Sequence, residues 1–211
     1  MQIIKIGAKH FIEDGYTKAT MKRISRELDL SPGNITFYFP TKDHLLAVLI
    51  NELFDFQNKV MEKAVADRKD PILEYCMSFA VIAAMCAEDG IAKDLYTSAY
   101  TAPYTLDLIR RNGTKKAKAA FGNFCKNFSE EDWSATGALI SGIEYGAITS
   151  LKPHAVTEKA LHSIMTLYGV PEDLRTQTVN CVLSFDHSSI GKRILRDFLD
   201  HVDKTNEIAD I

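Results

Sequence analysis

The sequence contains few cysteines, and none lies in a pairing pattern. Its four cysteines (Cys76, Cys86, Cys125 and Cys181) are far apart, with neither a Cys-x-x-Cys motif nor the spacing of a metal site. We expect them to be small buried hydrophobic residues in a reducing cytoplasm, with redox sensing as the alternative. No charged-then-apolar signal segment opens the chain, and no apolar run approaches the ~20 residues that cross a bilayer. The sequence therefore predicts a cytoplasmic protein with no membrane partner.

Sequence motifs of common enzyme chemistries are also missing. The chain has no Gly-x-Ser-x-Gly elbow, Walker loop, dinucleotide fingerprint or His-Glu-x-x-His motif. Its six histidines show no mutual ligand spacing. We therefore predict no catalytic residue, no metal site and no cofactor, and we do not expect an enzyme.

An overall surplus of positive charge is absent, since the chain has 25 Lys or Arg against 28 Asp or Glu. Residues 1–50 are the exception, because they hold seven Lys or Arg against five Asp or Glu. A polyanion would therefore have to bind at this end of the chain.

Strand signals, repeats and low-complexity segments are absent, and apolar residues recur at helical spacing almost throughout. We therefore predict an all-α fold. Residues 71–88 are apolar on nearly all sides, which predicts a helix at the centre of a larger domain. Beyond the first 40 residues, a long helix is expected to begin at 41 and to end near 66–71. The further expected helices are 71–88, 91–97, 103–111, 115–128, 130–151, 157–168 and 171–202. The Asn112-Gly113 pair is expected to interrupt the helical stretch around it.

Three short helices are expected before the long one. Gly15 should end the first, and Thr20 should cap the second. Ser31 should cap a third helix whose first residue is Pro32, where the missing N–H has no cost. Thr41 should cap the long helix that follows.

The third helix is expected to have two different faces. Ile35, Tyr38 and Phe39 fall at i, i+3 and i+4, which predicts that they face the other two helices, although the Tyr38 hydroxyl can still reach outward. The exposed face, from which we expect base contacts, consists of Pro32, Gly33, Asn34, Thr36 and Phe37. This arrangement after a tight turn is typical of a helix-turn-helix DNA reader. A helical subdomain that binds no nucleic acid is the alternative.

Residues 11–46, "FIEDGYTKATMKRISRELDLSPGNITFYFPTKDHLL", resemble the N-terminal signature of the tetracycline-repressor (TetR) family of bacterial regulators. The resemblance covers about the first quarter of the chain. Its matching residues are Phe11, Gly15, Tyr16, Thr20, Ile24, Ser31, Gly33, Tyr38, Phe39, Lys42 and Leu45. Asp29, Ser25 and Thr36 depart from the usual Gly, Ala and Tyr. Asp29 can still adopt the left-handed turn, whereas Thr36 makes the base contacts of relatives unsafe to transfer.

The resemblance implies a helix-turn-helix DNA-binding domain in residues 1–46 and a helical ligand-binding and dimerisation domain in 47–211. It also implies that Thr20, Tyr38 and Lys42 hold the DNA backbone. The partners it implies are a palindromic double-stranded operator, a second copy of the chain in a homodimer, and a small hydrophobic or aromatic effector.

Two sets of residues in the larger domain could serve these roles. The set suited to an effector pocket is Tyr75, Met77, Phe79, Met85, Cys86, Tyr96, Tyr100 and Tyr104. Ordinary core is the alternative for that set. Ala138, Gly142 and Gly146 give one helix a flat stripe, and the resemblance places segments 130–151 and 172–202 in a dimer interface. Packing within one subunit is the alternative for this stripe.

The function that we predict is a sequence-specific, ligand-responsive transcriptional regulator, most often a repressor in this family. The alternative is an all-helical enzyme or small-molecule carrier whose N-terminal helices only resemble a DNA reader.

Overall fold

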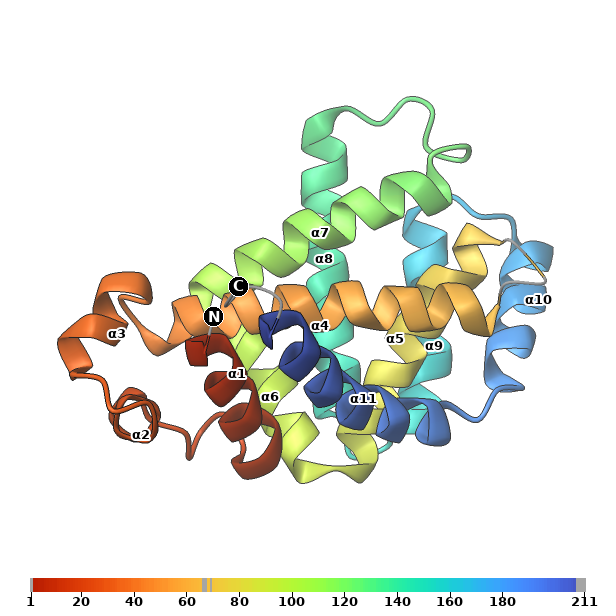
Figure 1. Cartoon of the computed structure of the whole chain (residues 1–211). Helices are drawn as coiled ribbons and strands as arrows, with labels where there is room; N and C mark the ends of the chain where they lie inside the picture. The colour runs from red at the N-terminus through yellow and green to blue at the C-terminus, as the bar shows by residue number, and fades with distance from the viewer. Residues whose placement is uncertain (1, 66–67, 69, 208–211) are drawn as a thin grey trace.

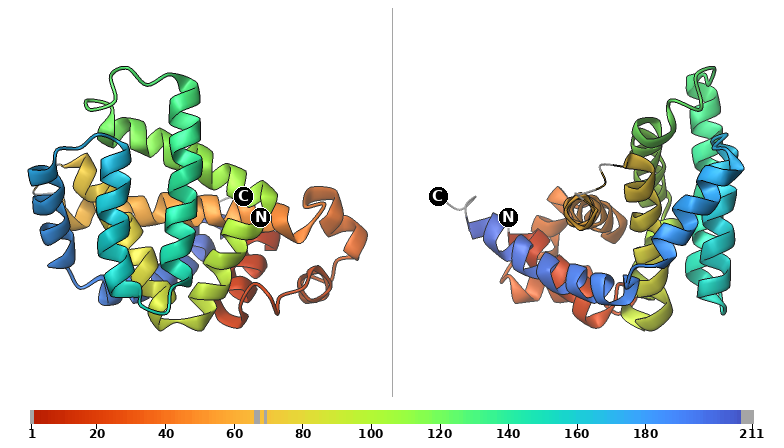
Figure 2. Two further views of the ribbon diagram at one scale, coloured as in Figure 1. Left: turned by 180° about the vertical axis from the view of Figure 1, so that it is seen from behind. Right: turned by 90° about the vertical axis from the view of Figure 1, so that its right-hand side faces the viewer.

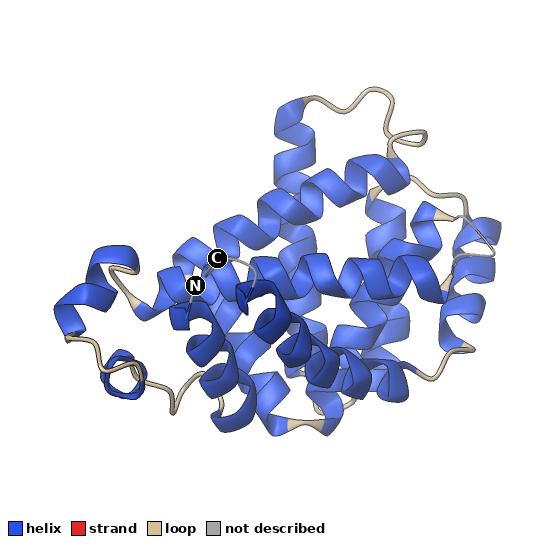
Figure 3. Cartoon of the chain, in the orientation of Figure 1, coloured by secondary structure: helices blue, strands red, loops and turns tan. Residues whose placement is uncertain are grey.

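The computed structural model describes residues 2–65, 68 and 70–207, and every regular element in these ranges is helical (Figure 3). This confirms the predicted all-α class. Residues 1, 66, 67, 69 and 208–211 of the two predicted domains lie outside the described part. The segment where the long helix was expected to end, 66–71, falls partly in this gap.

The first three helices form a small unit at one end of the molecule (Figure 1). Helix α1 (Gln2–Lys9) continues into a π-helical turn, His10–Asp14, and ends at Gly15. Gly15 has a φ of 92°, which glycine adopts without the steric cost of a Cβ. Helices α2 (Met21–Glu27) and α3 (Pro32–Tyr38) follow.

Local capping groups determine where α2 and α3 begin. The Thr20 hydroxyl accepts a hydrogen bond from the Arg23 N–H at 3.2 Å, and the Ser31 hydroxyl accepts one from the Asn34 N–H at 3.2 Å. Asp29 takes the turn between the two helices with a φ of 51°. These observations confirm the two predicted caps and the left-handed turn at Asp29.

Helix α4 (Lys42–Ala64) joins the small unit to the rest of the chain. Thr41 caps it, as predicted, by accepting a hydrogen bond from the His44 N–H at 3.4 Å. Leu45, Leu49 and Leu53 are buried along the helix. The domain boundary that we predict between residues 46 and 47 falls inside α4, so one continuous helix belongs to both units.

The remaining helices surround α5, which contacts α4 and each helix from α6 to α11 (Figure 2). Their bounds are α5 Pro71–Glu88, α6 Gly90–Thr101, α7 Pro103–Phe121, α8 Glu130–Thr149, α9 Pro153–Leu167, α10 Glu172–Leu183 and α11 His187–Glu207. This confirms the predicted central position of residues 71–88. Within the described ranges, α5 is also the one helix long and apolar enough to cross a membrane, but 61% of its apolar window is buried among the other helices. It is a core helix.

Three helix predictions are wrong. Helix α7 runs without a break through Asn112 and Gly113, and it ends at Phe121, whereas a helix was expected to reach 128. The Asn112 side chain donates a hydrogen bond to Asn51 on α4 at 2.8 Å, so a tertiary contact supports a position whose glycine costs only ~1 kcal/mol in helix propensity. The segment 171–202 is two helices, because Asp186 caps α11 by accepting hydrogen bonds from the Ser189 N–H and hydroxyl.

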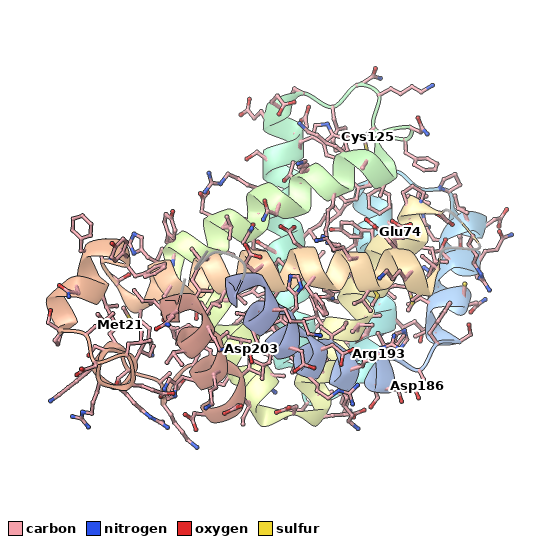
Figure 4. All side chains as sticks on the ribbon, in the orientation of Figure 1. Met21, Glu74, Cys125, Asp186, Arg193 and Asp203 are labelled. Carbon is pink, nitrogen blue, oxygen red and sulfur yellow. The ribbon has the colours of Figure 1, made fainter. Side chains whose placement is uncertain are left out.

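The break before α11 allows that helix to fold back along the molecule to α1. Ile194, Phe198 and Val202 are buried on its inner side. Lys5 and Asp203, the latter labelled in Figure 4, form an ion pair of 3.2 Å between α1 and α11. Helices α1 and α11 therefore lie side by side (Figure 1).

Candidate nucleic-acid interface and core cavity

Helix α3 is anchored by two apolar side chains at its inner side. Ile35 and Phe39 are buried. Pro32, Gly33, Asn34, Thr36 and Phe37 are all exposed on the opposite side, as the helical spacing predicts. The Thr36 hydroxyl donates a hydrogen bond to the Gly33 carbonyl at 3.1 Å, which leaves the Thr36 methyl group and the Asn34 amide as outward recognition groups.

The inward orientation predicted for Tyr38 is wrong. Its side chain is 60% exposed, beside a Phe37 ring that is 81% exposed. The two rings contact edge to face with centroids 5.2 Å apart. Because α3 ends at Tyr38 and the backbone extends at Phe39, the Phe39 ring fills the core position and Tyr38 turns outward. Two adjacent aromatic rings exposed on a short helix form a surface suited to contact with another molecule.

Lys42 and Thr20 both stabilise the segment before α2. The Lys42 ammonium donates hydrogen bonds to the carbonyls of Tyr16 at 2.8 Å and Ala19 at 3.0 Å, and it lies 3.9 Å from the centroid of the Tyr16 ring. Desolvation by burial lowers the pKa of Lys42, and the nearby Asp94 carboxylate opposes this effect. Both residues lie at helix N-termini on the surface of the small unit, where phosphate groups can approach free N–H groups.

A network around His10 holds α2 against the first helix, and sequence reasoning missed it. The buried His10 ring contacts Asp14 at 2.9 Å and Glu27 at 2.7 Å. Arg23 pairs with the same Asp14 carboxylate at 2.8 Å. The His10 hydrogen bond is the main cause of the lowered pKa of Asp14. The His10–Glu27 contact joins residues 17 positions apart, so no local spacing signals it.

The small unit contacts the larger one through two aspartates. Asp94 on α6 accepts hydrogen bonds from the Thr17 N–H, at 2.8 Å, and from the Thr17 hydroxyl. Asp43 in the first turn of α4 accepts from the Tyr104 N–H, at 3.2 Å, and from the Thr105 hydroxyl at the start of α7. Helix α6 is therefore bonded to the segment before α2, and the start of α7 is bonded to the first turn of α4.

A cavity of about 480 Å³ lies in the larger unit between α4, α5, α6, α7 and α8. Three residues of the predicted pocket set, Tyr75, Phe79 and Tyr100, line it. The other aromatic and apolar lining residues are Phe54, Ile82 and Ile109. This volume is in the range of small-molecule sites, ~300–1,000 Å³.

The other members of the predicted set lie elsewhere. Met85 packs against α11, where a Cβ on Gly191 would come within 2.2 Å of its Cγ. Cys86 is buried beside the Ala92 carbonyl, and Tyr96 packs on the Phe54 ring. Tyr104 is at the surface and stacks on His44. Met77 is buried in the core.

Polar groups that the sequence analysis did not single out also line the cavity. The Tyr100 hydroxyl donates a hydrogen bond to Glu144 at 2.8 Å. Burial raises the pKa of Glu144 to about 7, although the Tyr100 hydrogen bond and the Lys116 charge oppose this shift. Desolvation lowers the pKa of Lys116 to about 8, and the Lys116 ammonium donates to Asn58. The signal in the sequence is a carboxylate and a lysine on otherwise apolar helix faces.

Helix α8 has an open, apolar outer side. Gly142 and Gly146 are exposed, and a Cβ built on either would meet nothing within 4 Å. Leu139, which follows Ala138 on the same helix, is 61% exposed. The stripe predicted from Ala138, Gly142 and Gly146 is therefore accessible on the subunit surface, whereas the buried side of α11 is used within the subunit.

The fold and the exposed third helix define an all-α helix-turn-helix protein. Residues 3–49 match the family described as "Bacterial regulatory proteins, tetR family". Over these residues the chain is similar to that family.

Further comparisons cover a larger part of the chain. The "HTH-type transcriptional regulator HbdR" of Aromatoleum sp. (strain CIB) is 29% identical over 110 residues, which is 52% of this chain and 47% of the relative. The chain thus spans about half the length of the curated relative it matches. A crystal structure of RolR with resorcinol has a TM-score of 0.64 at 14% identity, covering 84% of this chain and 91% of that one. RolR without ligand gives 0.61 at 16% identity, with 85% and 95% covered. This likeness shows a shared fold.

Proposed function

We propose that this chain is a DNA-binding transcriptional repressor that acts in the cytoplasm and leaves its operator when a small hydrophobic or aromatic ligand binds. The observation that carries the proposal is the outer face of α3, where Asn34, Thr36 and Phe37 are exposed on a helix anchored from beneath. An amide at such a position suits adenine, and a methyl group or ring suits the thymine methyl. Thr20 at the start of α2, Tyr38 at the end of α3 and Lys42 at the start of α4 would contact phosphates.

The chain would act as a homodimer on a palindromic operator. The accessible stripe on α8 (Ala138, Gly142 and Gly146), together with α10, supports a dimer surface on which two backbones approach closely. Two copies of α3 would then enter successive major grooves about 34 Å apart, or a multiple of one helical turn.

Binding of the ligand would release the operator by a population shift. Tyr100 on α6 and Ile109 on α7 line the cavity; α6 also bonds to Thr17 through Asp94, and the start of α7 bonds to Asp43. A ligand that fits one position of α6 and α7 better than another would change the position of the reader. RolR, whose fold is similar, has been crystallised with the aromatic compound resorcinol, which supports an aromatic effector here.

The test begins with selection of bound DNA from a random pool, followed by binding of the selected site at several salt concentrations. We expect a palindromic site and an affinity that falls steeply with salt. Asn34→Ala should cost about 1–3 kcal/mol on that site alone and relax the preference at one symmetric position of each half-site. Asn123→Ala, exposed in the turn after α7, is the matched control.

If the selection enriches no DNA sequence although the protein melts normally, the proposal of a repressor is rejected. The chain would then be better described as a helical carrier or enzyme that uses the same cavity.

A further inference from the structure

The size of the core cavity restricts its ligand. A cavity of ~150 Å³ holds one benzene ring, and the volume here is about 480 Å³. A second hollow of about 210 Å³ adjoins it and shares Asn58, Tyr75, Ser78 and Lys116. Aromatic rings of Phe54, Phe79 and Tyr100 form much of the wall. The space therefore suits a flat molecule of two or three rings.

Gln57 provides a buried hydrogen-bond acceptor that a ligand can satisfy. Its side chain lines the cavity and is 1% exposed. The amide Nε2 donates a hydrogen bond to the Ser78 carbonyl at 2.9 Å, and this contact determines which end of the amide is which. Among the described residues nothing donates a hydrogen bond to the buried Oε1. An unpaired buried acceptor is unfavourable, so a ligand that brings a donor gains affinity there.

The charges around the cavity disfavour an anionic ligand. Asp55 and Glu144 line the larger space with Lys115 and Lys116, while Glu62 and Glu74 line the adjoining hollow with Lys116 alone. Glu74 is labelled in Figure 4. Lys116 already donates to Asn58. Over the two hollows together, four carboxyl groups stand against two lysine side chains, which disfavours a ligand carboxylate.

We propose that the cavity binds an uncharged aromatic molecule of two or three rings that carries a hydroxyl group, and that Gln57 selects it by accepting the hydroxyl hydrogen bond at Oε1. The inference rests on the proposed function, in which this cavity holds the effector, and it adds the chemical class of that effector. Gln57 is thereby a specificity-determining residue.

The experiment compares three two-ring probes by calorimetric titration of the full chain at pH 7. These are 2-naphthol, which has the hydroxyl donor, naphthalene, which lacks it, and 2-naphthoate, which is anionic. We expect 2-naphthol to bind about threefold to tenfold more tightly than naphthalene, the value of one neutral hydrogen bond. We expect 2-naphthoate to bind most weakly. This comparison uses the unaltered protein, so it does not depend on how any variant folds.

The variant Gln57→Met keeps the side-chain length and removes the acceptor. It should reduce the ratio of the 2-naphthol affinity to the naphthalene affinity to about one. The variant must melt at the same temperature as the parent, which shows that it is folded. Tyr96→Phe is the control, because the Tyr96 hydroxyl is also buried without a partner among the described residues but does not line the cavity. It should leave the ratio unchanged.

Absence of 2-naphthol binding, tighter binding of 2-naphthoate, or an unchanged ratio in Gln57→Met would each overturn the inference. Operator binding is measured in parallel to separate the two proposals. If the probe results contradict the proposed ligand class but the chain binds an operator, only the ligand proposal is rejected. If 2-naphthol binds as expected but no operator is found, only the proposed regulator function is rejected.

Discussion

Asp94 on α6 accepts two hydrogen bonds from Thr17, one from the backbone N–H at 2.8 Å and one from the hydroxyl. The two residues are 77 positions apart and belong to different units of the fold. Thr17 lies in the segment that leads to α2, and α6 carries Tyr100 into the cavity wall. This contact therefore joins the helix that carries Tyr100 to the segment that leads to α2.

Asp94→Asn should loosen the segment before α2. The neutral amide keeps one acceptor oxygen but loses the charge-assisted bonds, which are about twice as strong as neutral ones. We expect hydrogen exchange at residues 16–19 to become about 5–30-fold faster, corresponding to about 1–2 kcal/mol. Asp107→Asn removes an exposed carboxylate paired with Arg111 on α7 and serves as control. Equal exchange in both variants would show that the Asp94 contact does not order the segment.

Lys42→Ala should affect both DNA binding and the fold of the small unit. If Lys42 contacts a phosphate, the slope of log affinity against log salt should become shallower by about one unit for specific and nonspecific DNA alike. Because the ammonium also binds the Tyr16 and Ala19 carbonyls, we expect a stability loss of about 1–2 kcal/mol by urea unfolding. An unchanged salt slope with reduced stability would assign Lys42 a purely structural role. Lys159→Ala, on the exposed side of α9, controls for the loss of one charge.

Glu144 should make stability depend on pH. Its pKa rises from 4.5 to about 7 on folding, so the protonated carboxyl is favoured in the folded protein. The stabilisation is fully present below pH 4.5 and is lost as the pH rises through 7. Lys116 acts in the opposite direction, because its lowered pKa of about 8 removes stability as the pH falls from 10.5 through 8. Between pH 7 and 8 both charged forms are therefore unfavourable.

Glu144→Gln should consequently raise the free energy of unfolding at pH 8, by on the order of 2 kcal/mol, and change it little at pH 4.5. Urea unfolding at the two pH values measures this difference. Removing the carboxylate also removes a charge that favours protonated Lys116, so the gain is smaller than the Glu144 shift alone implies. A variant that is less stable at pH 8 than the parent would contradict the assignment.

Gly142→Leu should weaken the dimer. A Cβ at this position meets nothing within 4 Å inside the subunit, so the monomer should accept the larger side chain. In a dimer that packs through this stripe, the leucine would force the two helices apart. Sedimentation should give about twice 23.6 kDa for the parent at micromolar concentration and a lower mass for the variant.

Gly90→Leu, at the exposed start of α6, is the matched control, since its Cβ also meets nothing within 4 Å. A parent chain that sediments as a monomer yet binds a palindromic site tightly would exclude this dimer.

The sequence alone determined the features that depend on neighbouring residues. The all-α class, the caps at Thr20, Ser31 and Thr41, the end of the first helix at Gly15 and the exposed face of α3 follow from backbone hydrogen bonding and helical periodicity, which act over a few positions. Residues 11–46 carried the family resemblance because the third helix and its turn are one local unit. Asp186 was a cap of the same kind that the sequence analysis overlooked.

Only the tertiary structure decided which distant residues meet. Tyr75, Phe79 and Tyr100 line the cavity, while Met85, Cys86, Tyr96 and Tyr104 point elsewhere, because side-chain direction depends on how each helix is rotated against its neighbours. Asn51 supports Asn112 in a helix expected to break, and Phe39 displaces Tyr38 from the core. Gln57, Glu144 and Asp94 have no local motif at all. Their environment comes from helices far apart in the chain. The free energy of packing those helices depends on all of them together, so a short stretch of sequence does not predict it.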